Sequence, residues 1–457
     1  MKEKVSFPAR VLDTAASAGV VVVGGGTAGI AAAVAAARNG AETLLIEQSG
    51  CCGGMAARGL LTSIICMTDG KDVLANGICR EFVERITADM KLAETSYRWQ
   101  NIHPESVKRA ADMMLAEAGA RVLYETVVTD CAVENGTVTA LRCFSPCGGF
   151  AVTGKIFIDC TGDANLAALA GVPFEYGDEE GKVMAPTLCV MYDNISYPDD
   201  RCNGIGRREW SEAEKNHELP VDEHHFVGFF RNGEGCGAGN LGHIYGTDVL
   251  DIFSRSEAWT RGRALARRYH EFFRDKVAGF AKSGLTLSAD MLGVRESRRI
   301  AGEYQMTSDD YFARRHFDDD IGSFAYPVDI HASGGDAEKQ AAVEKKIIEV
   351  AYAAGENYGI PYRALLPKNT KNLLAAGRCI STDRAMQSSI RVVPGCMITG
   401  EAAGTAAAMT LSKGCSLRTL DVSSLQKRLV EQGAVIKVPP FPPDCRDLFP
   451  CGSESSS

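Results

Sequence analysis

The N-terminal part of the chain shows a short apolar run, a glycine cluster and an alanine-rich stretch in direct succession. Residues 20–23 are all valine, which is typical of a buried parallel strand. Residues 27–40 (TAGIAAAVAAARNG) are rich in alanine and end in Asn-Gly, so we expect a helix there. A second apolar run at 41–47 (AETLLIE) predicts a second strand. Together these patterns predict a βαβ unit.

Three glycines stand between the first strand and the helix in the spacing G-x-G-x-x-G. Gly24 suits the tight turn, Gly26 lets a pyrophosphate approach the backbone, and Gly29 lets helix and strand pack closely. Glu47 ends the second strand, where an acid accepts a hydrogen bond from a ribose hydroxyl and disfavours a 2′-phosphate. The unit therefore predicts a dinucleotide site that fits NADP less well. The motif alone does not separate NAD from FAD.

Three later stretches repeat the alternation of strand, turn and helix. Residues 154–173 predict a strand, a Thr-Gly-Asp turn and an alanine-rich helix, and residues 372–381 predict a strand that ends in glycine. Residues 391–411 form a loop that leads into a helix of small residues. Such a helix can pack close to a strand or a cofactor, and its N-terminus offers a positive dipole end to a flavin ring.

Together these motifs resemble the large bacterial family of FAD-dependent oxidoreductases that have a glutathione-reductase-type flavin domain. The resemblance runs from Val20 to about Leu411 and includes Gly53-Gly54 and residues 291–310 (MLGVRESRRIAGEYQMTSDD). It implies an α/β fold, with a discontinuous Rossmann-like FAD-binding domain and an inserted α+β substrate or cap domain. The expected ranges are 1–172 and 359–430 for the FAD-binding domain, 173–358 for the cap and 431–457 for a C-terminal tail.

The resemblance implies FAD as the cofactor and assigns residues to its parts. In relatives, segments matching Gly377-Arg378 meet the pyrophosphate and ribityl chain, and segments matching 394–397 lie along the isoalloxazine ring. Arg384 stands near the place where many relatives have a histidine. The implied cofactor-binding residues are Gly24, Gly26, Thr27, Ala28, Gly29, Glu47, Gln48, Gly53, Gly54, Met55, Val127, Thr161, Gly162, Asp163, Gly377, Arg378, Arg391, Pro394, Gly395, Cys396 and Met397.

The middle of the chain is richer in charged and aromatic residues and supplies the candidates for substrate chemistry. Residues 256–280 read as a long amphipathic helix whose arginines face solvent. Arg295, Arg298 and Arg299 carry guanidinium groups that suit a carboxylate or phosphate. The alternative is that Arg295 or Arg299 pairs with Glu296, Glu303 or an Asp of residues 317–320 (FDDD) to hold two domains together.

His331 is the candidate acid or base, because histidine carries protons near neutral pH. Tyr326, in the same segment, could donate a hydrogen bond to a substrate oxygen. His224, His225 and His243 are weaker candidates. Metal-type spacing with carboxylates or cysteines is absent around them, and we expect no metal site.

The chain has 16 cysteines, and Cys51-Cys52 follow the predicted nucleotide unit directly. In disulfide reductases of the wider fold the redox pair follows the Gly-Gly and is separated by several residues, whereas these two are adjacent and precede Gly53-Gly54. Adjacent cysteines have Cα atoms about 3.8 Å apart, below the usual range for a disulfide. We therefore interpret them as turn thiols, not as redox partners of the nucleotide.

Composition and charge limit the partners. The 457 residues carry a net charge of −9, which disfavours nucleic acid or an anionic membrane surface. No apolar run approaches the roughly 20 residues that a membrane helix needs, and the first 19 residues lack the apolar core of a signal peptide. We expect a cytoplasmic protein with a small-molecule substrate, anionic if an arginine binds it. A homodimer is compatible with the sequence, which does not specify the oligomeric state.

The resemblance implies an oxidoreductase that transfers a hydride between a small organic substrate and flavin N5, in a direction that the sequence leaves open. One alternative is an ene-reductase of an acidic substrate, similar to fumarate reductase. The other is a flavin-bearing electron-transfer subunit that docks on a partner protein. The chain lacks the cysteine runs of iron–sulfur clusters, which disfavours the last alternative.

Overall fold

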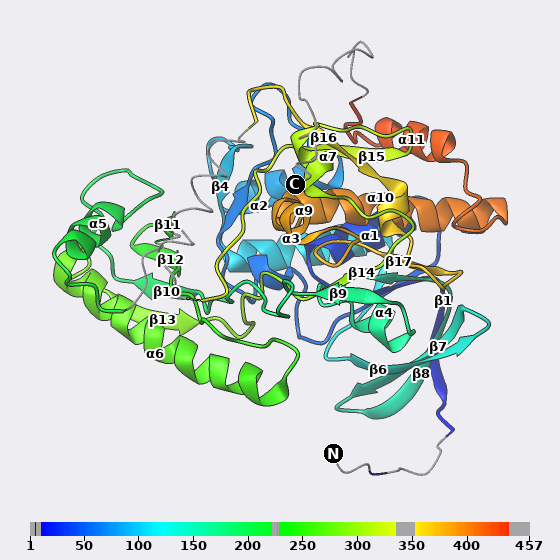
Figure 1. Ribbon diagram of the computed structural model, residues 1–457, viewed down its shortest axis with the longest axis horizontal. Helices are drawn as coiled ribbons and strands as arrows, with labels where there is room; N and C mark the ends of the chain where they lie inside the picture. The colour runs from blue at the N-terminus through cyan, green and yellow to red at the C-terminus, as the bar shows by residue number, and fades with distance from the viewer. Residues whose placement is uncertain (1–4, 6–10, 222–225, 227, 335–351, 438–457) are drawn as a thin grey trace, which may run out of the picture.

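Figure 1 shows the computed structural model, which describes residues 5, 11–221, 226, 228–334 and 352–437. Its central feature is a seven-stranded sheet with the order β5-β2-β1-β8-β7-β6, and β17 also pairs with β8. The strands are β1 (Thr14–Val23), β2 (Thr43–Ile46), β5 (Arg121–Leu123), β6 (Val127–Glu134), β7 (Thr137–Ser145), β8 (Gly148–Asp159) and β17 (Leu373–Ala375).

The long strand β8 joins the parallel and antiparallel parts of this sheet. One edge of β8 pairs with β1 along most of its length, and both strands run parallel. Its other edge pairs antiparallel with β7 over the first half and parallel with β17 over the last three residues. The strands β1, β2, β5, β8 and β17 therefore end at one edge, as the Rossmann-like α/β fold expected from the sequence requires.

Helices cover one face of the parallel strands. They are α1 (Thr27–Arg38), α2 (Ile78–Asp89), α3 (Pro104–Ala118) and α10 (Val393–Lys413), and their apolar residues share one core with the sheet (Figure 1). The two helices richest in small residues touch backbone to backbone, because a Cβ atom on Gly400 would lie 2.1 Å from the carbonyl oxygen of Ala28. On the other face, α4 (Asn165–Leu169) and β14 (Arg298–Ile300) share a second core with the sheet, and β14 pairs with β9 (Phe174–Tyr176).

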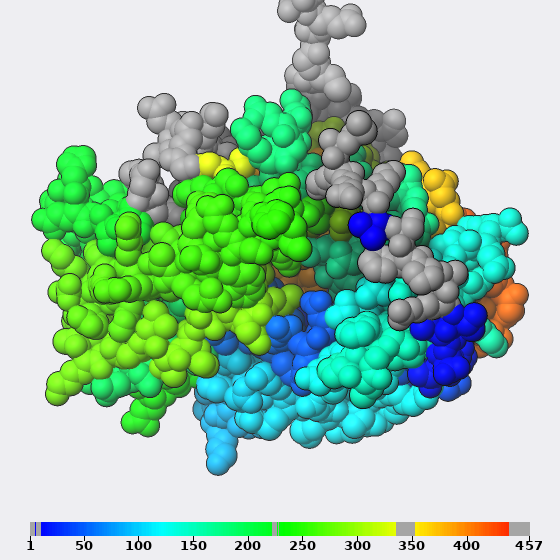
Figure 2. Space-filling model, turned by 90° about the horizontal axis from the view of Figure 1, so that it is seen from below, coloured from blue at the N-terminus to red at the C-terminus, as the bar shows by residue number. Residues whose placement is uncertain are grey.

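The cap has an aromatic core of its own. A four-stranded antiparallel sheet in the order β11-β12-β10-β13 packs against the 25-residue helix α6. The cap elements are β10 (Val190–Asp193), α5 (Arg207–Lys215), β11 (Gly228–Gly233), β12 (Cys236–Asn240), α6 (Ile252–Lys276) and β13 (Gly284–Ser288). In Figure 2 these residues, in green, form one side of the molecule and border the blue and cyan N-terminal part.

Helix α6 begins earlier than the sequence pattern predicts. It starts at Ile252 because the Asp251 carboxylate accepts hydrogen bonds from the backbone N–H groups of Phe253 and Ser254. It ends at Lys276, four residues before the predicted end. The arginines of the predicted polar face are exposed, as expected, and they are Arg261, Arg263, Arg267 and Arg268.

The remaining elements connect the cap to the main sheet or complete its core. Met306, Tyr311, Phe324 and Val328 share the core of α1 and α10, although they lie within the range expected for the cap. The domain boundaries expected at 172, 358 and 430 stay predictions. These remaining elements are η1 (Gly54–Ala56), β3 (Ser63–Ile65), β4 (Trp99–Asn101), α7 (Ser308–Phe312), β15 (Asp320–Phe324), β16 (Tyr358–Pro361), η2 (Tyr362–Leu365), α9 (Arg384–Ile390) and α11 (Val422–Glu431). Among the residues that the structure describes, none of the helices combines the length and the hydropathy of a membrane span.

Candidate active site

The glycine turn after β1 has the geometry that its sequence predicts. Gly24 has a φ of 101°, and a Cβ atom there would lie 2.6 Å from the carbonyl oxygen of Cys160. A Cβ atom on Gly29 would lie 1.8 Å from the carbonyl oxygen of Gly24. Both positions therefore require glycine for the turn and for the contact between helix and strand.

Gly26 is different, because a Cβ atom on it would meet no other atom within 4 Å. Helix α1 begins at Thr27, directly after this open space, and no side chain caps its N-terminus. A helix N-terminus offers N–H groups and a positive dipole end, which favour an anion. This cradle fits a pyrophosphate, and Thr27 and Ala28 lie in the first turn beside it.

Glu47 is held rigidly beside the glycine turn. Its Oε2 atom accepts a hydrogen bond from the Gly25 N–H (2.6 Å), and its Oε1 atom accepts from the Ser49 N–H (2.8 Å) and hydroxyl (2.7 Å). The Thr126 N–H donates to the Glu47 carbonyl oxygen (3.0 Å), which places the next residue, Val127, at the same edge. Gln48 is exposed beside Glu47. These positions suit the adenosine half of a dinucleotide.

Cys51 and Cys52 have separate free thiols. The Cys52 thiol supports the glycine turn, because a Cβ atom on Gly25 would lie 2.8 Å from its Sγ atom. Burial raises the pKa of Cys52 to about 12, against the opposing effect of a hydrogen bond with Tyr124. Burial also raises the pKa of Cys51. Protonated thiols are poor nucleophiles, so the structure favours a packing role.

The turn after β8 is built around the buried carboxylate of Asp159. Its Oδ1 atom accepts from the N–H (2.9 Å) and the hydroxyl (2.7 Å) of Thr161, and its Oδ2 atom accepts from the Ala167 N–H (2.8 Å). Gly162 has a φ of 75°, which this turn requires. Asp163 is thereby presented at the carboxyl ends of the parallel strands.

The segments around Asp163 and Arg378, which the resemblance assigns to the cofactor site, lie side by side. The Arg378 Nη2 atom lies 2.6 Å from the Asp163 Oδ1 atom. Gly377 has a φ of 84°, and its Cβ atom would lie 2.9 Å from that of Ala28. A second cation, Arg255 of the cap helix α6, lies 3.5 Å from the Asp163 Oδ2 atom. The sequence did not predict these ion pairs.

The N-terminus of α10 completes the expected flavin-side surface. No side chain caps this helix, and Pro394, Gly395, Cys396 and Met397 are buried in its first turn. Burial raises the pKa of Cys396 to about 12, so its thiol is neutral.

Gly53 and Gly54 connect this region to the N-terminal cradle. Both have positive φ values, and a Cβ atom on Gly54 would lie 3.0 Å from the Cα atom of Gly26. The next residue, Met55, reaches towards the cap, since a Cβ atom on Gly293 would lie 3.3 Å from its Cε atom. The segment 53–55 therefore lies between the glycine turn after β1 and the cap.

Tyr326 and Asp329 lie on the segment after β15, which packs on the junction of α9 and α10. The Asp329 N–H donates to the Ser388 hydroxyl oxygen (2.9 Å). The Arg391 Nη2 atom donates to the carbonyl oxygen and the Oδ2 atom of Asp329, each at 3.0 Å. Arg391, expected near the cofactor, thus fixes the segment that carries the substrate-side candidates.

Arg295 is buried where the cap meets this segment. Its Nη1 atom donates to the Ala185 carbonyl oxygen (2.7 Å) and to the Thr187 hydroxyl (2.8 Å), and its Nη2 atom donates to Asn240 Oδ1 (3.3 Å). The Gln387 Nε2 atom of α9 donates to the Arg295 carbonyl oxygen (2.9 Å). The guanidinium is therefore held by cap residues while its backbone is tied to the FAD-binding part.

His331 lies beside Asp329 and His243. Its Nε2 atom is 3.3 Å from an oxygen of the Asp329 carboxylate, and its Nδ1 atom is 2.8 Å from the His243 Nε2 atom. Burial, followed by the charge of Arg295, holds the pKa of His331 well below its usual value, so the imidazole is neutral at neutral pH. The sequence made His243 a weaker candidate, since no metal-type spacing surrounds it, and its contact with His331 spans 88 residues of the chain.

The carboxylate of Asp329 stays charged. Burial raises its pKa, but the hydrogen-bonded contact with His331 and the charges of Arg391 and Arg295 outweigh that effect and hold the pKa well below its usual range. Burial raises the pKa of the Tyr326 hydroxyl, so this group is neutral.

The other arginines of the motif at 291–310 have structural partners. The Arg299 Nη1 atom lies 2.6 Å from Glu296 Oε1, a pair that the sequence offered as an alternative to substrate binding. The Arg384 Nε atom donates to Glu296 Oε2 (3.0 Å). Arg384, which stands near the place of the relatives' histidine, is thus bonded to the fully buried carboxylate of Glu296. Arg298 donates to the Asp163 carbonyl oxygen (2.9 Å).

His224 and His225 lie outside the described residues. Within the described ranges, no group of three or more His, Cys, Asp or Glu side chains is arranged to hold a metal ion.

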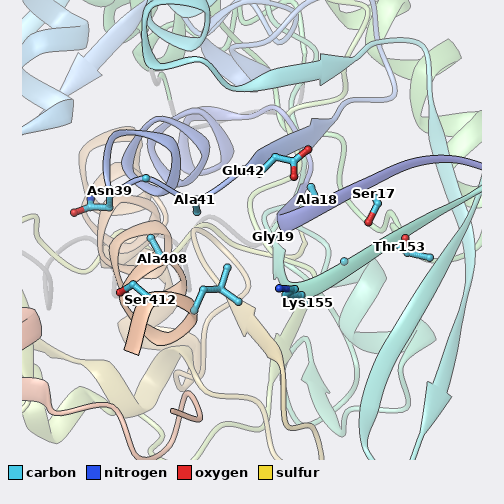
Figure 3. Close-up of a pocket in the computed structure, with 13 residues that line it drawn as sticks. Ser17, Ala18, Gly19, Asn39, Ala41, Glu42, Thr153, Lys155, Ala408 and Ser412 are labelled. Atoms are coloured by element: carbon cyan, nitrogen blue, oxygen red, sulfur yellow. The ribbon is translucent and has the colours of Figure 1, made fainter. Parts of the chain in front are cut away.

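A hollow of about 460 Å³ lies at the opposite edge of the sheet (Figure 3). Figure 3 shows Ser17, Ala18 and Gly19 of β1 and Thr153 and Lys155 of β8 around it, facing the end of α10. These residues lie well before the carboxyl ends of the parallel strands, whereas ligands of this fold bind beyond those carboxyl ends. The hollow is therefore separate from the candidate cofactor site.

Comparisons with known proteins identify the family of the chain. The family model described as FAD-dependent oxidoreductase matches residues 19–429. Among solved structures, the chain is similar to a geranylgeranyl bacteriochlorophyll reductase-like protein of Thermoplasma acidophilum, at 13% identity over 91% of this chain and 84% of that chain, with a TM-score of 0.48. It is also similar to the p-nitrophenol 4-monooxygenase PnpA of Pseudomonas putida DLL-E4, at 14% identity over 92% and 87%, with a TM-score of 0.44. No curated protein matches the chain. Because the family model spans nearly the whole sequence, the chain belongs to the family of FAD-dependent oxidoreductases.

Proposed function

We propose that the protein exchanges a hydride between a small organic substrate and the N5 atom of FAD, with the substrate bound beside Arg295 and His331. The observation that carries this proposal is the cluster of the buried Arg295 and His331 with the half-buried Asp329, next to Arg391 and the first turn of α10. Charged groups buried in this way are expensive unless they serve a partner or a reaction. When bound, FAD supplies the redox chemistry, and the protein supplies orientation and electrostatics.

The residues of this cluster suit two tasks. The Arg295 guanidinium can hold a carboxylate of an anionic substrate by charge-assisted hydrogen bonds. The neutral imidazole of His331 can accept a proton while the carboxylate of Asp329 stabilises the resulting charge. The neutral hydroxyl of Tyr326 can donate to a substrate oxygen. We expect the protein to act in the cytoplasm on a small molecule, without nucleic acid or membrane as a partner.

The test is anaerobic bleaching of the flavin by a panel of hydroxy acids, amines and polyols, with enoates offered to the reduced protein. Arg295→Ala should weaken an anionic substrate by on the order of 2–5 kcal/mol, seen in KM or in turnover. Arg295→Lys keeps the charge but loses the planar fork, and it should recover only part of the loss. If enoates reoxidise the reduced flavin and no other compound of the panel reacts, the protein is an ene-reductase instead. If Arg295→Ala lowers only thermal stability and FAD retention, this residue joins domains and does not bind substrate.

A further inference from the structure

The short segment that follows α11 runs along β15. The Ser323 N–H of β15 donates to the Val435 carbonyl oxygen (3.1 Å), and the Lys437 N–H donates to the Ser323 hydroxyl oxygen (2.9 Å). The side chain of Ile436, between these two contacts, packs against the main core. Residues 433–437, which we call the strap, are therefore fixed on β15 by hydrogen bonds and by apolar packing.

The strap also binds the loop of residues 66–76, which follows β3. The Asn76 side chain donates from its Nδ2 atom to the Gly433 carbonyl oxygen (2.7 Å). At the other side of the loop, the Lys437 Nζ atom donates to the Oδ2 atom of Asp69 (2.8 Å). Two hydrogen bonds at separate places therefore tie this loop to the strap.

The contact between Lys437 and Asp69 involves a fully buried carboxylate. The Oδ1 atom of Asp69 accepts from the backbone N–H groups of Lys71 (2.9 Å) and Asp72 (2.7 Å). Burial raises the pKa of Asp69, but the hydrogen bonds from the Asp72 N–H and from Lys437 outweigh burial and hold the pKa below its usual value. Asp69 is therefore charged at neutral pH, and without Lys437 this buried charge would lose its cation.

The loop begins beside the substrate-side candidate Tyr326. Ser323, which binds the strap, lies three residues before Tyr326 on the same chain segment. Burial is the main effect that raises the pKa of Tyr326, and the thiol of Cys66, the first loop residue, lies within electrostatic reach of the same hydroxyl, as does Asp329. Cys66 and Tyr326 are both half-buried, so each keeps some contact with solvent. The strap therefore fixes the two segments that meet at Tyr326.

Resting on the function proposed above, we propose that Lys437 is a positioning residue for the substrate side of the site. Its ammonium group binds Asp69 and its backbone N–H binds Ser323, so it holds the loop 66–76 against the segment that carries Tyr326. The loop and this segment then form one closed wall beside the hydroxyl that donates to the substrate. Lys437 touches no reacting atom and acts only through the position of these neighbours.

The first experiment removes the charge of Lys437 in the full chain loaded with FAD. In Lys437→Met, the backbone amides of residues 67–75 should exchange hydrogen at least about tenfold faster than in wild type, because the buried carboxylate has lost its cation. Lys437→Arg keeps a cation and should recover most of the protection. Lys427→Met is the matched control, since Lys427 is an exposed lysine of α11. Unchanged exchange of the loop in Lys437→Met would overturn the proposal.

The second measurement separates positioning from mere support. With a panel compound that reduces the flavin, Lys437→Met should lower kcat about tenfold or more at the FAD content of wild type, because the wall beside Tyr326 is displaced. Lys437→Arg should restore kcat in part, and Lys427→Met should match wild type. Faster exchange of the loop together with wild-type kcat and KM would overturn the positioning role and leave Lys437 as a structural contact.

A third readout needs no substrate. The quenching of flavin fluorescence by neutral acrylamide should rise on the order of twofold in Lys437→Met, because an open wall admits the quencher, and it should stay at the wild-type value in Lys427→Met. If no panel compound reduces the flavin but loop exchange and quenching rise together, the proposed redox function fails and the positioning role stands. Wild-type quenching despite an open loop would overturn that role.

If Lys437→Met fails to fold, the double variant with Asp69→Asn takes its place in all three measurements. This variant has neither the buried carboxylate nor its cation, so it avoids an unpaired charge but still lacks the tie between strap and loop. It should show the same faster exchange of residues 67–75. Wild-type exchange in the double variant would overturn the proposal.

Discussion

A Cβ atom on Gly404 of α10 would stand 2.1 Å from the carbonyl oxygen of Ala32 in α1. Gly400, one turn earlier, makes the same approach to Ala28. The two helices therefore have no room for side chains where they cross. Because α1 starts at the pyrophosphate cradle and α10 starts at the flavin-side surface, their separation also sets the distance between these two parts of the site.

Gly404→Ala should force α1 and α10 apart. Overpacking of a tight core contact costs about 1–3 kcal/mol, so we expect a lower Tm and a reduced fraction of bound FAD. Ser412→Ala is the control, since Ser412 is exposed near the end of the same helix. Differential scanning fluorimetry and the flavin absorbance measure both effects. A Gly404→Ala protein with wild-type Tm and FAD content would show that the contact can relax freely.

Gly26→Ala should leave the fold intact but weaken FAD binding by on the order of tenfold or more, which is about 1.4 kcal/mol. The added Cβ atom meets no protein atom, so it fills only the space that the pyrophosphate needs. Gly50→Ala is a matched control, because its Cβ atom also meets nothing within 4 Å. The FAD released on denaturation, per mole of protein, gives the comparison. Equal FAD content in both variants would contradict the position of the cradle.

The double variant with Cys51→Ser and Cys52→Ala should reduce its flavin at a rate within about a factor of two of the wild-type rate. Both native thiols are protonated at neutral pH, and burial raises the pKa of Cys52 to about 12. Loss of the Cys52 side chain should instead lower the Tm, because its Sγ atom packs under Gly25. Turnover that disappears while FAD stays bound would identify these cysteines as a redox pair.

Glu401 should make the protein less stable as the pH rises. Burial raises its pKa in the folded protein to about 8, from about 4.5 in the unfolded chain. The folded state holds the extra proton between these values, so the stability present below pH 4.5 is lost as the pH rises through 8. Its Oε2 atom accepts from the Ile78 N–H (3.1 Å), a role that glutamine can take over.

Glu401→Gln removes this titration. The variant should match wild type near pH 5 and exceed it near pH 9, by on the order of 4 kcal/mol at most. The measurement is chemical denaturation across pH 5 to 9. Glu234→Gln, at an exposed position between β11 and β12, should keep the wild-type pH dependence. Parallel curves for wild type and Glu401→Gln would mean that Glu401 ionises without penalty in the folded protein.

The nucleotide part of the site could be predicted because its chemistry is local. Gly24, Gly26 and Gly29 stand within six residues. Gly24 and Gly29 each have a backbone or contact requirement that only glycine meets easily, and Gly26 borders open space. Glu47 follows at the end of the next strand, so the βαβ geometry alone places it beside the turn. The helix of small residues within 391–411 was also predicted because its pattern is local in the sequence, and it is observed as α10.

The substrate side could be predicted only in part, because it is assembled from distant segments. His331 was a candidate by residue type, but its partner His243 comes from a cap loop, and no sequence period links them. Glu296 has one contact that the sequence could predict and one that it could not. It lies three residues from Arg299, so their pair was open to prediction, whereas its contact with Arg384 depends on how α9 packs. Tertiary packing, not local pattern, decides such contacts.

The contact between α1 and α10 has a consequence for the newly made chain. Helix α1 leaves the ribosome early, but the helix that covers its alanine face begins only at residue 393. At about 5–20 residues per second, this interval lasts on the order of twenty seconds to a minute. During it the apolar face of the first helix is uncovered, so synthesis of this protein should depend on chaperones that hold the N-terminal third until the last helices emerge.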